Sequence, residues 1–152
     1  MNIMIAYDNS TNAKNALEKT LQMFAALKPK VTLISVIEDV LGSSGVNEPY
    51  YLEYKRDFSE AVRETAQTLN ELGISTEVMI AEGDPRKMIL QAVEHKQPDL
   101  LVIARHSEKV DSNIIGKTLD AWVEEFNFMT FGNVSSFLTR RAPCPVLIQS
   151  CQ

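Results

Sequence analysis

Five short apolar runs, separated by longer stretches of helical periodicity, constrain the fold of this chain more than any other feature. The runs at 31–37, 99–104 and 145–149 are nearly continuous in Val, Ile and Leu, as expected of parallel strands covered by helices on both faces. The other two runs lie at 3–7 and 75–81. The sequence therefore predicts five strands.

Four stretches repeat apolar residues at a spacing near 3.6, the period of an amphipathic helix. The first follows the capping candidates Ser10 and Thr11, the second ends at Gly73, and the third begins with Asp84 and Pro85. The apolar stripes are Ala13, Ala16, Leu17, Leu21, Phe24 and Leu27; Phe58, Ala61, Val62, Ala66, Leu69 and Leu72; Met88, Ile89, Ala92 and Val93; and, in a last short helix, Val134, Phe137 and Leu138 with Arg141.

Alternation of strand and helix predicts an α/β fold, a doubly wound, Rossmann-like sheet of five parallel strands. We expect residues 1–152 to form a single domain. Sheets of this kind bind ligands beyond the carboxyl ends of their strands. Asp8 follows the first strand there, and Arg105, His106 and Ser107 follow the fourth. These residues are either site residues or ordinary strand-to-helix turns.

The segment 108–131 does not fit the simple alternation, because unbroken loops of that length are uncommon in compact domains. Ile115, Leu119, Trp122 and Phe126 recur within it at helical spacing. We expect an inserted amphipathic helix before the last helix. It covers the strand ends, recruits a protein partner, or simply completes the core at the edge of the sheet.

Composition excludes several classes of function. Fifteen Lys and Arg against 20 Asp and Glu give a net charge of −5, the wrong sign for nucleic-acid binding. No apolar run approaches the roughly 20 residues of a membrane helix, and the amino terminus does not resemble a signal peptide. The two cysteines, Cys144 and Cys151, have no zinc-ligand spacing. We expect a cytoplasmic protein without a structural metal and without a membrane or nucleic-acid partner.

Motifs for catalysis are weak. The segment 111–118 ends in Gly-Lys-Thr but has Asp111 where a phosphate-binding P-loop requires glycine. A phospho-acceptor receiver would need an acidic pair after the first strand, where only Asp8 stands. His95 is expected to be a solvated surface residue, and His106 has no nucleophile or carboxylate beside it in sequence. We therefore expect no enzymatic activity.

Residues 131–137, where Gly132 and small polar residues lead into the last helix, are a candidate phosphate site. Unpaired N–H groups and the helix dipole attract anions at such a terminus. Alternatively, Asn133 or Ser135 caps those N–H groups itself.

Several of these stretches together resemble the universal stress protein family. They are MIAYDNS at 4–10, VIED at 36–39, EGDP at 82–85, PDLLVIA at 98–104 and, most distinctively, GNVSSFLTRRAPCPVLI at 132–148. The resemblance covers nearly the whole chain except 108–131. It implies a five-stranded parallel α/β fold, a homodimer formed through the last strand, and either ATP binding or its absence, since the family contains both kinds of member.

The resemblance also implies which residues form the nucleotide site. Asp8 and Val36 would contact ribose and adenine, respectively. The family's glycine pattern for phosphates, G-x2-G-x9-G-[ST], falls on Ala104, Ser107, Gly132 and Asn133, followed by Val134 and Ser135 at the start of the last helix. Only one glycine remains, and the insertion lengthens the gap before it. Because Ala104 and Ser107 carry a Cβ where the backbone would approach the ligand, the phosphate cradle should be impaired.

Two hypotheses follow. In the first, the chain is a non-catalytic stress-response or regulatory domain without standard ATP binding and without a fixed cofactor. In the second, it binds ATP in an altered site, where Ser107 and Asn133 donate hydrogen bonds and Arg105, His106 or Lys117 meets the phosphates. Slow ATP hydrolysis is a third and weaker possibility, because the sequence identifies no metal ligands beyond Asp8.

Overall fold

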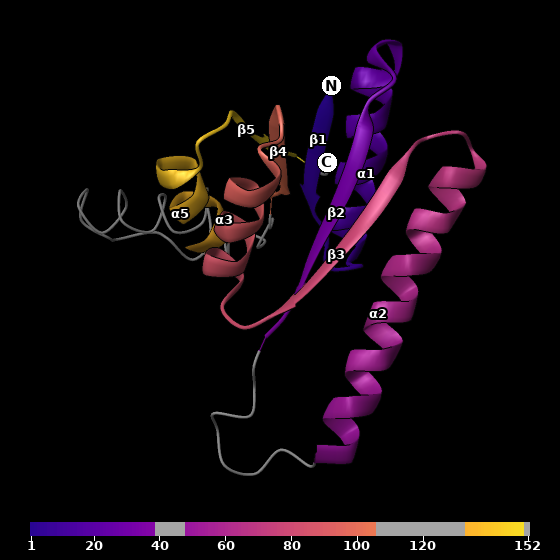
Figure 1. The fold of residues 1–152 in the computed structure, drawn as a ribbon, viewed down its shortest axis with the longest axis vertical. Helices are drawn as coiled ribbons and strands as arrows, with labels where there is room; N and C mark the ends of the chain where they lie inside the picture. Colours follow the sequence, from indigo (N-terminus) through magenta and orange to yellow (C-terminus); the bar gives the residue numbers. More distant parts are fainter. Residues whose placement is uncertain (39–47, 106–132, 151–152) are drawn as a thin grey trace, which may run out of the picture.

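The computed structural model describes residues 1–38, 48–105 and 133–150 (Figure 1). The strands are β1 (Asn2–Ala6), β2 (Lys30–Ile37), β3 (Thr76–Glu82), β4 (Leu100–Ala104) and β5 (Val146–Gln149). The helices are α1 (Thr11–Phe24), a 3-10 turn η1 (Ala25–Leu27), α2 (Glu48–Glu71), α3 (Pro85–Lys96) and α5 (Asn133–Arg141). All five predicted strands are present, as are the four helices predicted outside 108–131, within a few residues of the predicted boundaries except at the start of α2.

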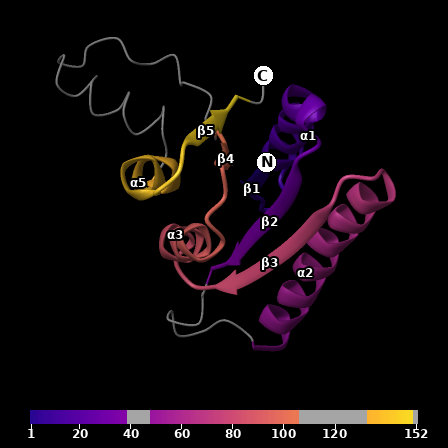
Figure 2. The ribbon, with the colours of Figure 1, turned by 45° about the horizontal axis from the view of Figure 1, so that its top comes forward.

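The five strands form one sheet of order β3-β2-β1-β4-β5, and all the neighbouring pairs are parallel. Helices α1 and α2 pack on one face and α3 and α5 on the other, as the tilted view in Figure 2 shows. This arrangement confirms the doubly wound α/β fold.

The sheet divides the core into two layers because side chains alternate along each strand. Ile3 and Ile5 of β1 pack with Leu17 and Val62 beneath α1 and α2. Met4, between them in sequence, packs on the opposite face beneath α3 and α5. Strands covered on both faces in this way read as continuous apolar runs, which is how they were detectable in the sequence.

Local capping explains where the helices begin and end. The Ser10 hydroxyl accepts the Ala13 N–H at 3.1 Å, so Ser10 rather than Thr11 caps α1. Asp84 caps α3 by accepting the Arg86 N–H at 2.9 Å. Gly73 has a φ of 83°, the left-handed conformation that glycine adopts readily just after a helix.

Helix α2 begins at Glu48, well before the first residue of its predicted stripe, Phe58. Of the tyrosines at its start, Tyr51 is buried, whereas Tyr50 and Tyr54 are exposed. Leu27 and Leu72 were expected in the core but are exposed, because each lies beyond the last turn of its α-helix.

The insertion at 108–131 and the P-loop-like segment at 111–118 lie outside the described residues. Within the described part of the chain, no helix is both long enough and apolar enough to cross a membrane. In that same part, no three His, Cys, Asp or Glu side chains come together as potential metal ligands.

Candidate functional site

The carboxyl ends of β1, β2 and β4 meet at the point where the strand order reverses, which is where doubly wound sheets bind ligands. Ala6 pairs with Ile34 on one side and with Ile103 on the other. Continuing this register by two residues puts Val36 and Arg105 level with Asp8. The structure therefore brings the ends of these strands to one edge, as the topology predicted for Asp8 and as the family resemblance implied for Val36 and Ala104.

Asp8 lies in the tight turn between β1 and α1 and is exposed. Its Oδ1 accepts the N–H of Ser10 at 3.0 Å, whereas Oδ2 has no partner among the residues that the structure describes. Asn9 adopts a left-handed conformation with a φ of 62°, which asparagine tolerates better than most residues. The turn thus presents an exposed carboxylate at the amino end of α1, with one oxygen held by the Ser10 N–H.

Tyr7 lies directly beneath this turn and is only 2% exposed. Its hydroxyl donates to Asn9 Oδ1 at 3.3 Å and lies 3.2 Å from the hydroxyl of Thr65 on α2. Burial raises the pKa of the Tyr7 phenol above its usual value. The hydrogen bond with Thr65 lowers this pKa, and the Asp8 charge raises it, so that the net effect is a raised pKa. Tyr7 therefore stays protonated at neutral pH. Sequence analysis took Tyr7 for an ordinary strand residue, and its position immediately before Asp8 was the only available signal.

Apolar side chains line the neighbouring strand ends. Val36 is half-buried and packs, together with Ala6 and Val134, against the apolar cluster beneath α3 and α5 that includes Ile103. Ala104 is also half-buried, at the end of β4, where it pairs with Gln149. The edge therefore combines an apolar surface with the exposed carboxylate of Asp8.

The predicted phosphate-binding residues are only partly described. Arg105 is exposed, and its N–H donates to the carbonyl of Gln149 at 2.9 Å. Ser135 is buried in the first turn of α5. Asn133 begins that helix, but its side chain is not described, and Ser107 and Gly132 lie outside the described residues, as do His106 and Lys117.

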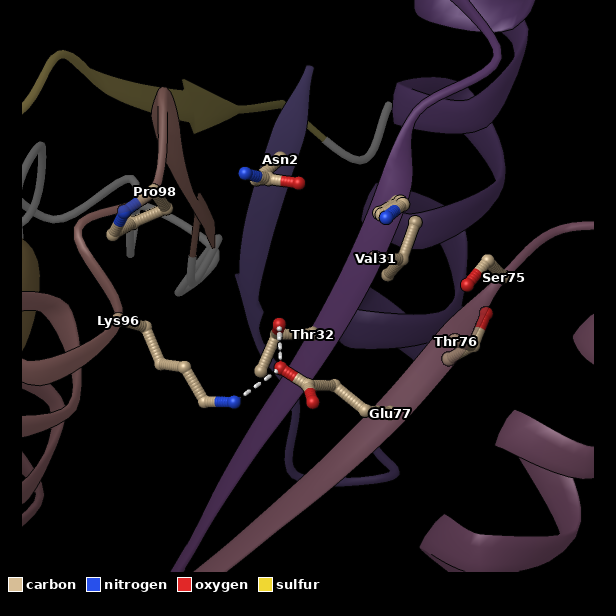
Figure 3. Close-up of a pocket in the computed structure, with 9 residues that line it drawn as sticks. Asn2, Val31, Thr32, Ser75, Thr76, Glu77, Lys96 and Pro98 are labelled. Atoms are coloured by element: carbon tan, nitrogen blue, oxygen red, sulfur yellow. Dashed lines mark hydrogen bonds and ion pairs between the residues drawn. The ribbon is translucent and has the colours of Figure 1, made fainter.

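A hollow of about 390 Å³ lies at the opposite, amino edge of the sheet (Figure 3). Its charged centre is Glu77, whose Oε1 accepts the Thr32 hydroxyl and the Lys96 ammonium, both at 2.8 Å. The Lys96 and Thr32 bonds lower the pKa of Glu77. The charges of Glu77 and Lys96 in this hollow offset each other, and the hollow includes none of the predicted site residues. We therefore place the candidate site at the carboxyl edge.

Comparisons with known proteins agree with this fold. The model of the universal stress protein family matches residues 1–149. Among curated proteins, the chain is 32% identical over 78 residues to a universal stress protein A-like protein from Arabidopsis thaliana. That match covers 51% of this chain and 36% of the relative, so it spans only about a third of the relative's length.

Two solved structures have the same architecture across almost the whole chain. The universal stress protein UspA from Lactobacillus plantarum has a TM-score of 0.70 at 18% identity, covering 97% of this chain and 96% of its own. A universal stress protein family protein from Arabidopsis thaliana, solved with AMP bound, has a TM-score of 0.64 at 22% identity, covering 100% of this chain and 92% of its own.

Proposed function

The chain belongs to the universal stress protein family, and from this premise we propose that it is a non-catalytic stress-response domain that binds an adenine nucleotide through its adenosine part. The proposal places adenosine at the carboxyl edge of the sheet, with Asp8 against the ribose and Val36 against the adenine. It assigns no reaction to the site.

The observation that carries this proposal is the pairing of Ala6 with Ile34, because Asp8 and Val36 each follow two residues later at the ends of these neighbouring strands. Asp8 Oδ2, which has no partner among residues 1–38, 48–105 and 133–150, can accept hydrogen bonds from ribose hydroxyls. The half-buried Val36 gives the adenine ring an apolar surface at the next strand end. The Arabidopsis structure with AMP bound supports an adenine nucleotide as the ligand class for this fold.

We further propose that the site lacks the glycine cradle for a triphosphate. Ala104 stands at the first glycine position of the family's phosphate pattern, and its Cβ obstructs close approach of a ligand to the backbone. Ser107 adds a second Cβ in the same segment. Arg105 supplies an exposed cation that can pair with a single phosphate. A monophosphate such as AMP therefore fits the remaining groups better than ATP does.

Thermal unfolding with AMP and with ATP tests this function. A ligand at 100 times its Kd stabilises the folded state by about 2.7 kcal/mol, which raises Tm by roughly 5–10 °C in a chain of this size. We expect AMP to raise Tm at lower concentration than ATP.

Asp8→Asn should weaken AMP binding at least about tenfold, because it replaces a charged acceptor. Asp57→Asn, at an exposed position on α2, is the matched control.

Ala104→Gly tests the missing cradle. We expect this variant to gain affinity for ATP while its affinity for AMP changes little. Tighter binding of ATP than of AMP by the unaltered chain would contradict the monophosphate preference and favour the altered ATP site. Failure of both nucleotides to shift Tm would refute nucleotide binding altogether.

We propose in addition that the chain forms a homodimer through β5, which is an edge strand of the sheet. Sheet edges present unpaired backbone groups that can pair with a second copy of the same strand. A protein partner at residues 108–131 was also predicted, but that segment lies outside the described residues.

A further inference from the structure

We propose that Tyr7 and Thr65 form a positioning lock that couples helix α2 to the Asp8 turn and so sets the affinity of the nucleotide site. This inference rests on the proposed function, because it concerns how Asp8 is held for its ligand. Neither residue is proposed to touch the nucleotide.

Tyr7 is fixed at every polar group. Its N–H donates to the Ile34 carbonyl at 2.9 Å, and its own carbonyl accepts the hydroxyl of Ser35. Its hydroxyl reaches Asn9 and Thr65 at the opposite end of the side chain. Because Tyr7 immediately precedes Asp8, these bonds fix the backbone from which the carboxylate projects.

The two hydroxyls form an ordered chain of hydrogen bonds. Asn9 Oδ1 and the Ala61 carbonyl can only accept, so the Tyr7 proton points to Asn9 and the single Thr65 proton is shared between the Tyr7 oxygen and the Ala61 carbonyl. The Thr65 hydroxyl also lies 3.1 Å from the Ala61 carbonyl in the preceding turn of α2. The chain therefore runs from α2 through Tyr7 to Asn9, the residue whose left-handed φ shapes the turn.

Helix α2 is well placed to hold one end of this chain. Val62 and Ala66, on either side of Thr65 in sequence, are buried against the sheet. Nearer its amino end, Tyr51 donates to one oxygen of Glu82 at 3.1 Å and Lys55 pairs with the other at 2.7 Å. These contacts tie α2 to the carboxyl end of β3, on the same edge of the sheet as Asp8.

Two substitutions remove the lock while preserving size. Tyr7→Phe deletes the central hydroxyl, and Thr65→Val deletes the hydroxyl on α2. Thr68→Val is the matched control, because Thr68 makes the same bond to a carbonyl four residues earlier in α2 but is exposed. We expect the first two to weaken AMP binding roughly 3- to 10-fold, the value of one buried hydrogen bond, and Thr68→Val to leave it unchanged.

Two readouts separate positioning from a general loss of stability. The Ser10 amide is bonded to Asp8 within the turn, so its hydrogen exchange should accelerate in Tyr7→Phe and Thr65→Val more than exchange in the core strands does. The 2′,3′-dideoxy analogue of AMP lacks the hydroxyls that Asp8 would accept. Its affinity should therefore be the same in these variants as in the unaltered chain.

Each result decides between the proposals. AMP binding that both substitutions leave unchanged, or an equal loss for AMP and the dideoxy analogue, overturns the lock but not the proposed function. Absence of AMP binding by the unaltered chain overturns both. Unchanged Ser10 exchange in Tyr7→Phe overturns the lock independently of any ligand.

Discussion

Asp84 illustrates how one residue can carry both a helix cap and an ion pair. Its Oδ1 accepts the Arg86 backbone N–H at 2.9 Å, and its Oδ2 lies 2.7 Å from the Arg86 guanidinium. The guanidinium is the main cause that lowers the pKa of Asp84 from 3.8 to about 2. A carboxyl whose pKa is lower in the folded state stabilises the fold above its unfolded pKa, and this contribution disappears as the pH falls through the folded pKa.

Replacing Asp84 with Asn gives a prediction with a definite sign. Asn can still cap the helix, so the variant loses only the charge. We expect the unaltered chain to have the higher Tm at pH 7 and the difference to shrink as the pH falls from about 4 to about 2. Calorimetry across this range measures it. A Tm difference that is constant with pH would mean that the Asp84 charge does not contribute.

Residues whose roles depend on near neighbours were predictable, and those with distant partners were not. Asp84 was predicted as a cap and Ser10 as one of two candidates, because a cap and the N–H groups that it accepts lie within a few residues of each other. Tyr7 was missed because its partner Thr65 lies 58 positions further along the chain. An apolar run that ends in tyrosine predicts a strand, and nothing local reveals what its hydroxyl will contact.

At the scale of elements, burial decides which helices the fold depends on. Leu138 of α5 is completely buried, whereas Leu72, just beyond the end of α2, is 71% exposed. Leu138→Ala should therefore destabilise the fold by about 2–5 kcal/mol, and Leu72→Ala by less than about 0.5 kcal/mol. Chemical denaturation of both variants measures this difference. Similar losses would show that α5 is not packed on the sheet as described.

Periodicity predicted the part of each helix that faces the sheet. In α2 it identified the stripe from Phe58 onward, because these side chains pack on β2 and β3. It missed the turns from Glu48, where Tyr50, Leu52 and Tyr54 are exposed and produce no clear stripe. That end of the helix is attached instead through Glu82, a contact that depends on the completed fold.

For the whole molecule, topology is what places the proposed site at the carboxyl edge of the sheet. The alternation of strands and helices predicted that Asp8 and the turn after the fourth strand lie at the carboxyl edge, the family resemblance added Val36 and Ala104, and the structure confirms that β1, β2 and β4 end at this edge. The hollow at the amino edge contains no predicted residue. The phosphate half could not be predicted in the same way, because residues 108–131 interrupt the glycine pattern in the sequence.

The outer edge of β5 makes the proposed dimer testable. The Leu101 N–H donates to the Pro145 carbonyl and the Arg105 N–H to the Gln149 carbonyl, so alternate residues of β5 face β4. In this pattern Val146 and Ile148 direct their backbone N–H groups away from β4, where carbonyl groups of a second copy could accept hydrogen bonds from them. An edge strand also tolerates proline at such a position, because the N–H group that proline lacks makes no hydrogen bond within the sheet.

Ile148→Pro should therefore disrupt the dimer and preserve the fold. It removes one outward donor from each protomer, and two lost hydrogen bonds weaken association by at least about tenfold. Ile148→Ala shortens the side chain but keeps the N–H, so it should remain dimeric at the same concentration. Sedimentation velocity of the three proteins measures this, with circular dichroism to verify the fold. A monomeric unaltered chain, or a proline variant that dimerises fully, would exclude pairing through this edge.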